Sequence, residues 1–122
     1  MIIFLTKRNL MSLAKYEMSQ EMFFCYAESQ SISGTTSKVI LLIDDKKLII
    51  LFLNFFLTKI IDKVCYDREK IENQKIKNGL FLDVIWSFSV GNSKWRFRIL
   101  RKILLLKNTQ GQFIDKISRL TH

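Results

Sequence analysis

Residues 44–79, DDKKLIILFLNFFLTKIIDKVCYDREKIENQKIKNG, contain the densest apolar run of the chain and decide how the rest must fold around it. Within it, residues 48–57 are apolar except for Asn54, and the residues from Lys59 onward are rich in charge and end at Asn78-Gly79. Oppositely charged side chains lie three or four positions apart in the second half, as on a solvated helix face. Its apolar residues recur at helical spacing: Leu57, Ile60, Ile61, Val64 and Ile71. The pattern predicts one long central helix over about 46–77, with Gly79 as its C-terminal stop.

The start of this stretch has a second interpretation. Asp45 can cap a helix that begins at Lys46. Alternatively, residues 44–47 form a hairpin turn, and 48–53 is a strand that pairs with 38–43. Periodicity does not separate a buried strand from a buried helix in an all-apolar run. The long helix is favoured because neither Pro nor Gly interrupts it, and the strand alternative stays open.

Strand patterns occur on both sides of this stretch. Residues 21–27 (EMFFCYA) and 38–43 (KVILLI) are compact apolar runs, which predict a hairpin over about 22–43. Residues 93–99 (SKWRFRI) alternate basic and apolar side chains, the period of a half-buried strand. Gly91 supplies a turn before them, so a second hairpin is expected over about 80–105. A short C-terminal helix follows at about 112–120.

These elements predict an α+β fold in which a small antiparallel sheet packs on the central helix. The length of 122 residues and the 48% hydrophobic content indicate one globular domain, 1–122. Cys25 and Cys65 are expected to be buried free thiols, since a secreted disulfide framework would use more cysteines. A reducing intracellular compartment follows, with cytoplasm and mitochondrion left open. Whether Met1 or Met11 is the true start also stays open.

Positive charge is concentrated at the end of the chain. The net charge is +9, and residues 92–122 hold 8 Lys/Arg against 1 Asp/Glu. In the predicted second hairpin the basic side chains share one strand face, with Trp95 and Phe97 on the other. Such a row can meet successive phosphates of a polyanion. The candidate nucleic-acid-binding residues are Lys94, Arg96, Arg98, Arg101 and Lys102.

Catalytic motifs are scarce. The only histidine is the last residue, His122, and no glycine-rich phosphate loop is present. The adjacent carboxylates Asp44 and Asp45 are better explained by a charged turn or a helix N-terminus, because Lys46 and Lys47 follow at once. The sequence therefore predicts no enzyme, no metal site and no cofactor.

Two functions are compatible with these features. The first is a small basic RNA-binding or ribonucleoprotein (ribosome-associated) component; the absence of Pro and the few Gly and Ala residues indicate AT-rich coding, as in an organelle. The alternative is a structural or partner-binding subunit of a larger, membrane-associated assembly, in which residues 48–57 dock a partner helix or lipid. That apolar run is too short to span a bilayer, which takes about 20 residues. Expected partners are thus RNA or another polyanion, protein subunits, or a membrane surface.

Overall fold

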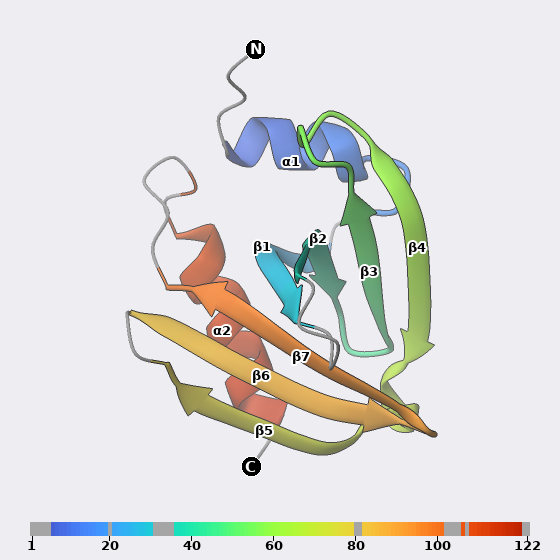
Figure 1. The fold of residues 1–122 in the computed structure, drawn as a ribbon, viewed down its shortest axis with the longest axis vertical. Coiled ribbons are helices and arrows are strands. Elements are labelled where there is room, and N and C mark those ends of the chain that lie inside the picture. Colours follow the sequence, from blue (N-terminus) through green and yellow to red (C-terminus); the bar gives the residue numbers. More distant parts are fainter. Residues whose placement is uncertain are drawn as a thin grey trace.

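The computed structural model describes residues 6–19, 21–30, 36–79, 82–101, 106 and 108–120. Most of them lie in strands (Figure 1). The strands are β1 (Phe23–Gln30), β2 (Thr36–Ile43), β3 (Lys47–Leu53), β4 (Ile60–Asp67), β5 (Glu72–Asn78), β6 (Asp83–Val90) and β7 (Ser93–Leu100). The helices are α1 (Lys7–Ala14), a single 3₁₀ turn η1 (Arg68–Lys70) and α2 (Thr109–Leu120).

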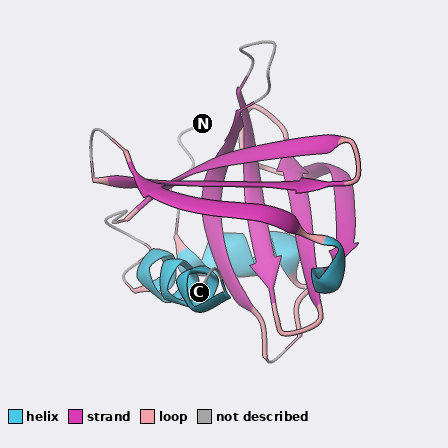
Figure 2. Cartoon of the chain, turned by 90° about the horizontal axis from the view of Figure 1, so that it is seen from below, coloured by secondary structure: helices cyan, strands magenta, loops and turns pink. Residues whose placement is uncertain are grey.

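The seven strands form one antiparallel sheet in the order β4-β3-β2-β1-β7-β6-β5. It consists of two meanders, β1–β4 and β5–β7, joined where β1 pairs with β7 at Glu28–Arg98 and Ser29–Phe97. Figure 2 shows the strands of one half crossing those of the other. The sheet therefore folds over on itself and has an inner and an outer face.

The main core fills the space between the two halves. Its largest fully buried side chains are Trp86, Phe97 and Phe113, with ring centroids of Trp86 and Phe113 6.0 Å apart. Phe113 comes from α2, which packs against β1 and β7 (Figure 1). A second apolar cluster lies on the outer face of β1–β3, where Leu10 and Ala14 of α1 cover it. The outer face of β5–β7 has no such cover from the described helices.

The predicted helix over about 46–77 is wrong, and with it the α+β fold class: the chain is mostly antiparallel sheet. Asp44 makes a tight turn, because its Oδ1 accepts hydrogen bonds from the backbone N–H of Lys46 (2.7 Å) and Lys47 (2.8 Å). The turn reverses the chain, and β3 then pairs with β2 from Leu48–Ile43 onward. For residues 48–53 the strand alternative is thus the correct one.

The charged half of this stretch is also extended. In β4 the half-buried Val64 and Tyr66 alternate with exposed neighbours, which is the period of a strand. Asn73 has a φ of 57°, at a bulge in the pairing of β5 with β6. Ion pairs three or four apart add only about 0.2–0.5 kcal/mol each to a helix. Pairing with β3 and β6 outweighs that small local preference.

The elements predicted outside this stretch are present. β1 pairs with β2 and β6 pairs with β7, which confirms the two hairpins, and the C-terminal helix begins at Thr109. Cys25 is buried as expected, but Cys65 is exposed on β4, so that half of the prediction is wrong.

Candidate anion-binding surface

Basic side chains form ordered rows on the outer face of β5–β7. Alternate residues of a strand point to the same face, about 6–7 Å apart. Lys94, Arg96 and Arg98 of β7 therefore share the outer face, while Phe97 and Ile99 are fully buried on the inner one. Arg96 lies opposite Ser87 of β6, which in turn lies opposite Lys75 of β5. Arg98 belongs to a parallel row that crosses five strands: Lys38, Glu28, Arg98, Ile85 and Lys77.

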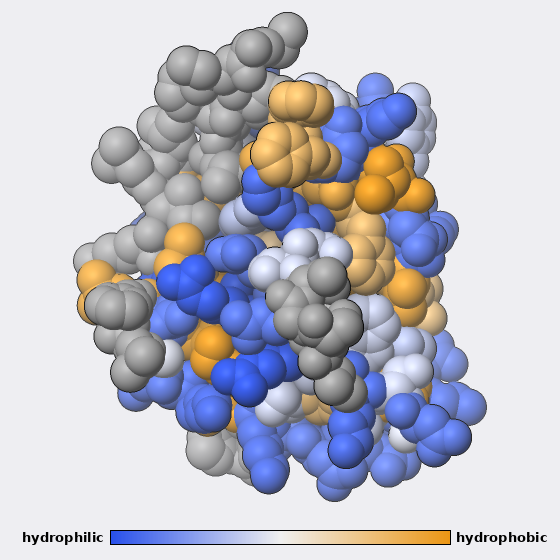
Figure 3. Space-filling view, in the orientation of Figure 1, coloured by the Kyte–Doolittle hydropathy of each residue, from blue (hydrophilic) through white to orange (hydrophobic). Residues whose placement is uncertain are grey.

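A hollow of about 640 Å³ lies over the first of these rows. Three cations line it, Lys75, Lys94 and Arg96. Its uncharged polar lining is Gln30, Asn73, Ser87 and Ser89. None of its described lining residues is Asp or Glu. Figure 3 shows hydrophilic side chains gathered over this half of the sheet.

A second hollow, of about 360 Å³, adjoins the first and shares Gln30 and Arg96 with it. Lys77 and Arg98 bring further positive charge to it, and Asp83 brings a carboxylate. The two hollows together make up the basic groove.

The cations of the first hollow are free to bind a ligand. Among the described residues, Lys75, Lys94 and Arg96 make no ion pair. Lys75 and Arg96 lie on the strands on either side of Ser87. Their Cα atoms are therefore about 10 Å apart, which is twice the distance between neighbouring strands. A phosphate above Ser87 can accept a hydrogen bond from its hydroxyl and charge-assisted bonds from both cations.

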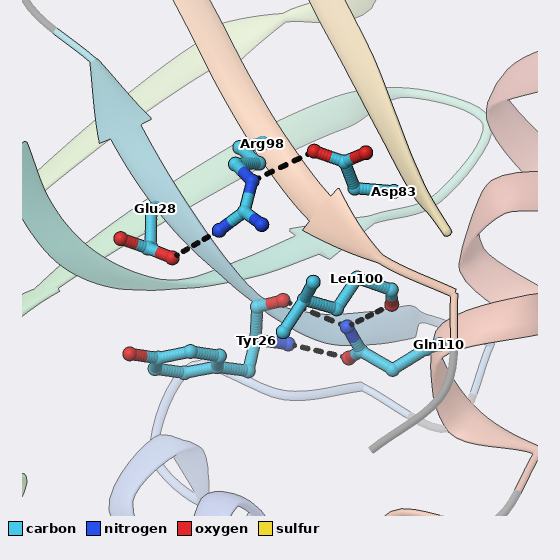
Figure 4. Close-up of polar contacts among 6 residues, drawn as sticks. All are labelled: Tyr26, Glu28, Asp83, Arg98, Leu100 and Gln110. Atoms are coloured by element: carbon cyan, nitrogen blue, oxygen red, sulfur yellow. Dashed lines mark hydrogen bonds and ion pairs between the residues drawn. The ribbon is translucent and has the colours of Figure 1, made fainter. Parts of the chain in front are cut away.

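Arg98, by contrast, is committed to structure. Its Nε donates to Asp83 Oδ2 at 2.7 Å and its Nη1 to Glu28 Oε1 at 3.1 Å (Figure 4). The hydrogen bond that Arg98 donates to Asp83 is the largest cause of the raised pKa of the Arg98 guanidinium. Gly79 leaves room for this pair, because a Cβ there would lie 2.1 Å from Asp83 Oδ1. The two carboxylates offset the charge of Arg98 on the surface.

The five residues expected from the sequence thus have different roles. Lys94 and Arg96 line the main hollow, and Arg98 lines the neighbouring one while tied to acids. Arg101 donates to Asn78 Oδ1 just beyond β7. Lys102 lies outside the described residues.

Lys75 and Ser87 also line the main hollow, and neither is among the residues expected from the sequence. Lys75 lies in the stretch that the spacing predicts as helix, and Ser87 lies in the hairpin predicted over about 80–105, on the strand without the basic alternation. The available signal was the alternation Lys75-Ile76-Lys77, which places both lysines on one strand face.

Tyr26, on β1 two residues before Glu28, makes folding sensitive to alkaline pH. Burial, and secondarily the charge of Glu28, raise its pKa to about 12. Its ordinary value is 10.0. The stabilisation is complete below pH 10, where Tyr is neutral in both states, and is lost as pH rises toward 12. After allowance for solvent screening, we expect a loss of about 1–2 kcal/mol.

Denaturant unfolding between pH 9 and pH 12 measures this loss. Cys25→Ala is the suitable background, since burial also raises the pKa of the Cys25 thiol. Adding Tyr26→Phe should flatten the alkaline limb. An equal loss with and without the tyrosine would contradict the assignment.

In the part of the chain that the structure describes, we looked for a metal site, a catalytic carboxylate pair and a membrane-spanning helix. No group of three or more His, Cys, Asp or Glu side chains there could hold a metal ion. Asp44 caps the β2–β3 turn and Asp45 pairs with Lys116 of α2, so the adjacent carboxylates are structural. Neither described helix has the length and apolarity needed to cross a bilayer.

Comparison with known proteins rests on structure. No protein-family model matches the sequence, and neither does any curated protein. The fold is similar to that of the hSac2 domain from the human phosphoinositide phosphatase Sac2, with a TM-score of 0.53 and 11% sequence identity. The match covers 93% of this chain and 76% of that chain.

This match corrects the functional prediction. An RNA-binding or ribosome-associated component was inferred from charge and composition, whereas the fold resembles a domain of a phosphoinositide phosphatase, and no comparison points to RNA or ribosomes. That prediction is wrong. The basic residues of β7 form one surface together with residues of β5 and β6. Among them, Arg98 is paired with Glu28 and Asp83. Protein partners and the cellular compartment stay predictions.

Proposed function

We propose that the chain is a non-catalytic module that binds phosphorylated lipid headgroups at a membrane surface through the basic groove. The observation that carries the proposal is the hollow in which Lys75, Lys94 and Arg96 surround serine hydroxyls without a carboxylate among the described lining residues. Its size lies within the roughly 300–1,000 Å³ typical of small-molecule sites.

The chemistry of the lining favours phosphomonoesters. Arg96 can bond two phosphate oxygens at once, and Lys75 and Lys94 add point charges on either side. Ser87 and Ser89 can donate hydroxyl hydrogen bonds to phosphate oxygens, whereas the quaternary ammonium of choline offers no acceptor and is repelled by the three cations. The similarity to a domain of a phosphoinositide phosphatase brings inositol phospholipids forward as the first class to test.

Binding is a better account of the groove than catalysis. Hydrolysis of a phosphoester needs a nucleophile, a general acid or base, or a metal. The described residues of the main hollow offer amines, a guanidinium, amides and hydroxyls, without an imidazole, thiol or carboxylate to activate them.

Vesicle flotation tests the proposal. The purified chain would be mixed with phosphatidylcholine vesicles alone, with phosphatidylserine, or with phosphatidylinositol bisphosphate at matched surface charge. We expect the strongest binding to the bisphosphate vesicles, less to phosphatidylserine and none to phosphatidylcholine. Binding should weaken with salt, because the screening length falls to about 3 Å at 1 M.

Soluble ligands separate the headgroup from the bilayer as the source of binding. Calorimetry with inositol trisphosphate should show binding in the groove, and inorganic phosphate should bind more weakly. Equal partition to all three vesicle types, or no binding to any of them, would overturn the proposed function.

A further inference from the structure

Two adjacent aromatic side chains project from the turn between β3 and β4. Phe55 is 78% exposed and Phe56 is 66% exposed. Their rings contact each other edge to face, with centroids 5.3 Å apart. Ile61, the second residue of β4, is also 61% exposed. Single exposed apolar residues are ordinary, but a contiguous exposed group marks an interaction site.

The turn is built to hold these rings outward. The Asn54 side-chain carbonyl accepts hydrogen bonds from the backbone N–H of Thr58 (2.8 Å) and Lys59 (3.1 Å), and its amide donates to Thr58 Oγ1 (2.7 Å). Leu57 adopts a φ of 60° and packs against the apolar cluster under α1. One side chain of the turn is thus anchored inward while the two phenylalanines are presented to solvent.

Lysines lie beside the two rings, and the first acid after the turn is Asp62. Lys38 Nζ lies 4.8 Å from the centroid of the Phe55 ring, and Lys59 is exposed at the end of the turn. Residues 54–61 include no Asp or Glu. Aromatic tips flanked by lysines match the boundary of an anionic bilayer, where rings enter the acyl region and ammonium groups meet phosphates.

Lys38, which contacts Phe55, shares an outer-face row of the sheet with residues of the basic groove. Lys38 lies opposite Glu28 on β1, and Glu28 lies opposite Arg98 on β7. Lys38 therefore belongs to the same outer-face row as Arg98 and Lys77. A membrane that meets the groove along this row also meets the residue that contacts Phe55.

We propose that Phe55 and Phe56 insert into the headgroup–acyl boundary of an anionic membrane while the basic groove holds a phosphorylated headgroup. This inference rests on the proposed function for the contact between the groove and the headgroup. It adds an apolar contact between the two phenylalanines and the membrane. Each ring leaves water on insertion, so binding to vesicles exceeds binding to the soluble headgroup.

The test compares Phe55→Ser/Phe56→Ser with Leu82→Ser, which removes an 80% exposed apolar side chain just before β6. The double variant should bind bisphosphate vesicles about 10- to 100-fold more weakly, the factor expected when the exposed part of two Phe side chains no longer leaves water. Its affinity for inositol trisphosphate should be unchanged, and Leu82→Ser should behave as wild type in both assays. In Phe55→Trp, brominated lipid should quench fluorescence beyond the wild-type background of Trp86 and Trp95.

Each outcome decides between the two ideas. Unchanged vesicle affinity in the double variant, or no extra quenching in Phe55→Trp, overturns insertion and leaves the groove intact. Vesicle binding that depends on Phe55 and Phe56 without any inositol trisphosphate binding overturns the headgroup function and leaves insertion standing. A change from dimer to monomer in the double variant overturns insertion in favour of a second copy of the chain. Absence of vesicle binding in the wild type overturns both.

Discussion

Reversing the charge of Lys75 and Arg96 to glutamate is expected to weaken binding to bisphosphate vesicles by at least about 100-fold, since each basic charge near an anionic surface contributes about 1 kcal/mol. Both side chains line the main hollow without an ion pair among the described residues, so no described carboxylate offsets their charge. The variant replaces two attractive contacts with two repulsive ones. Inositol trisphosphate binding should be lost in the same variant, since the same side chains hold the headgroup.

The matched control is Lys7→Glu/Arg119→Glu. These residues are exposed on α1 and α2 and lie outside the lining of either part of the groove. The control changes net charge by the same amount, so it measures the non-specific attraction of a basic protein to an anionic surface. Equal losses in the two double variants would show that net charge, and not the groove, governs binding.

Gln110→Ala is expected to destabilise the fold more than any polar substitution on the surface. Gln110 is fully buried, and its Oε1 accepts from the Tyr26 N–H at 2.8 Å. Its Nε2 donates to the carbonyls of Tyr26 and Leu100, both at 2.9 Å (Figure 4). One side chain of α2 thus satisfies backbone groups of β1 and β7 at the seam between the two sheet halves. Leaving these groups buried without partners should lower the free energy of unfolding by about 3–4 kcal/mol.

Thermal unfolding followed by circular dichroism measures this effect. For a chain of this length the loss corresponds to a fall in Tm of about 10–15 °C. Gln112→Ala, an exposed position on the same helix, controls for helix propensity and should change the stability by less than about 0.5 kcal/mol. Equal Tm values for the two variants would mean that α2 is held by its apolar residues alone.

Local pattern was enough for part of the fold. The alternation of β7 and the Gly91 turn identified the β6–β7 hairpin, since strand period and turn chemistry are properties of neighbouring residues. The same alternation placed Lys94, Arg96 and Arg98 on one face. Lys94 and Arg96 then proved to line the hollow.

The spacing of apolar residues gave the wrong structure where it fitted both a helix and a strand. Residues 46–77 satisfied helical spacing, yet pairing of β3 with β2 and of β5 with β6 decided their structure. Both pairings are hairpins between consecutive strands, with Ile43 opposite Leu48 and Asn78 opposite Val84, and each buries backbone and side chains together. The spacing of apolar residues within one segment does not report whether that segment pairs with its neighbour.

The site shows the same division. Lys75 lies opposite Ser87, and Ser87 lies opposite Arg96, only because three strands are adjacent in the sheet. Arg98 is neutralised by Glu28 and Asp83, which come from β1 and β6. The amount of positive charge, the alternation that aligns it on β7 and the apolar content that requires a core all follow from the amino-acid order alone. The tertiary structure decided which cations stay free, which serines stand between them and which aromatic turn lies beside them, because these depend on strand order and register.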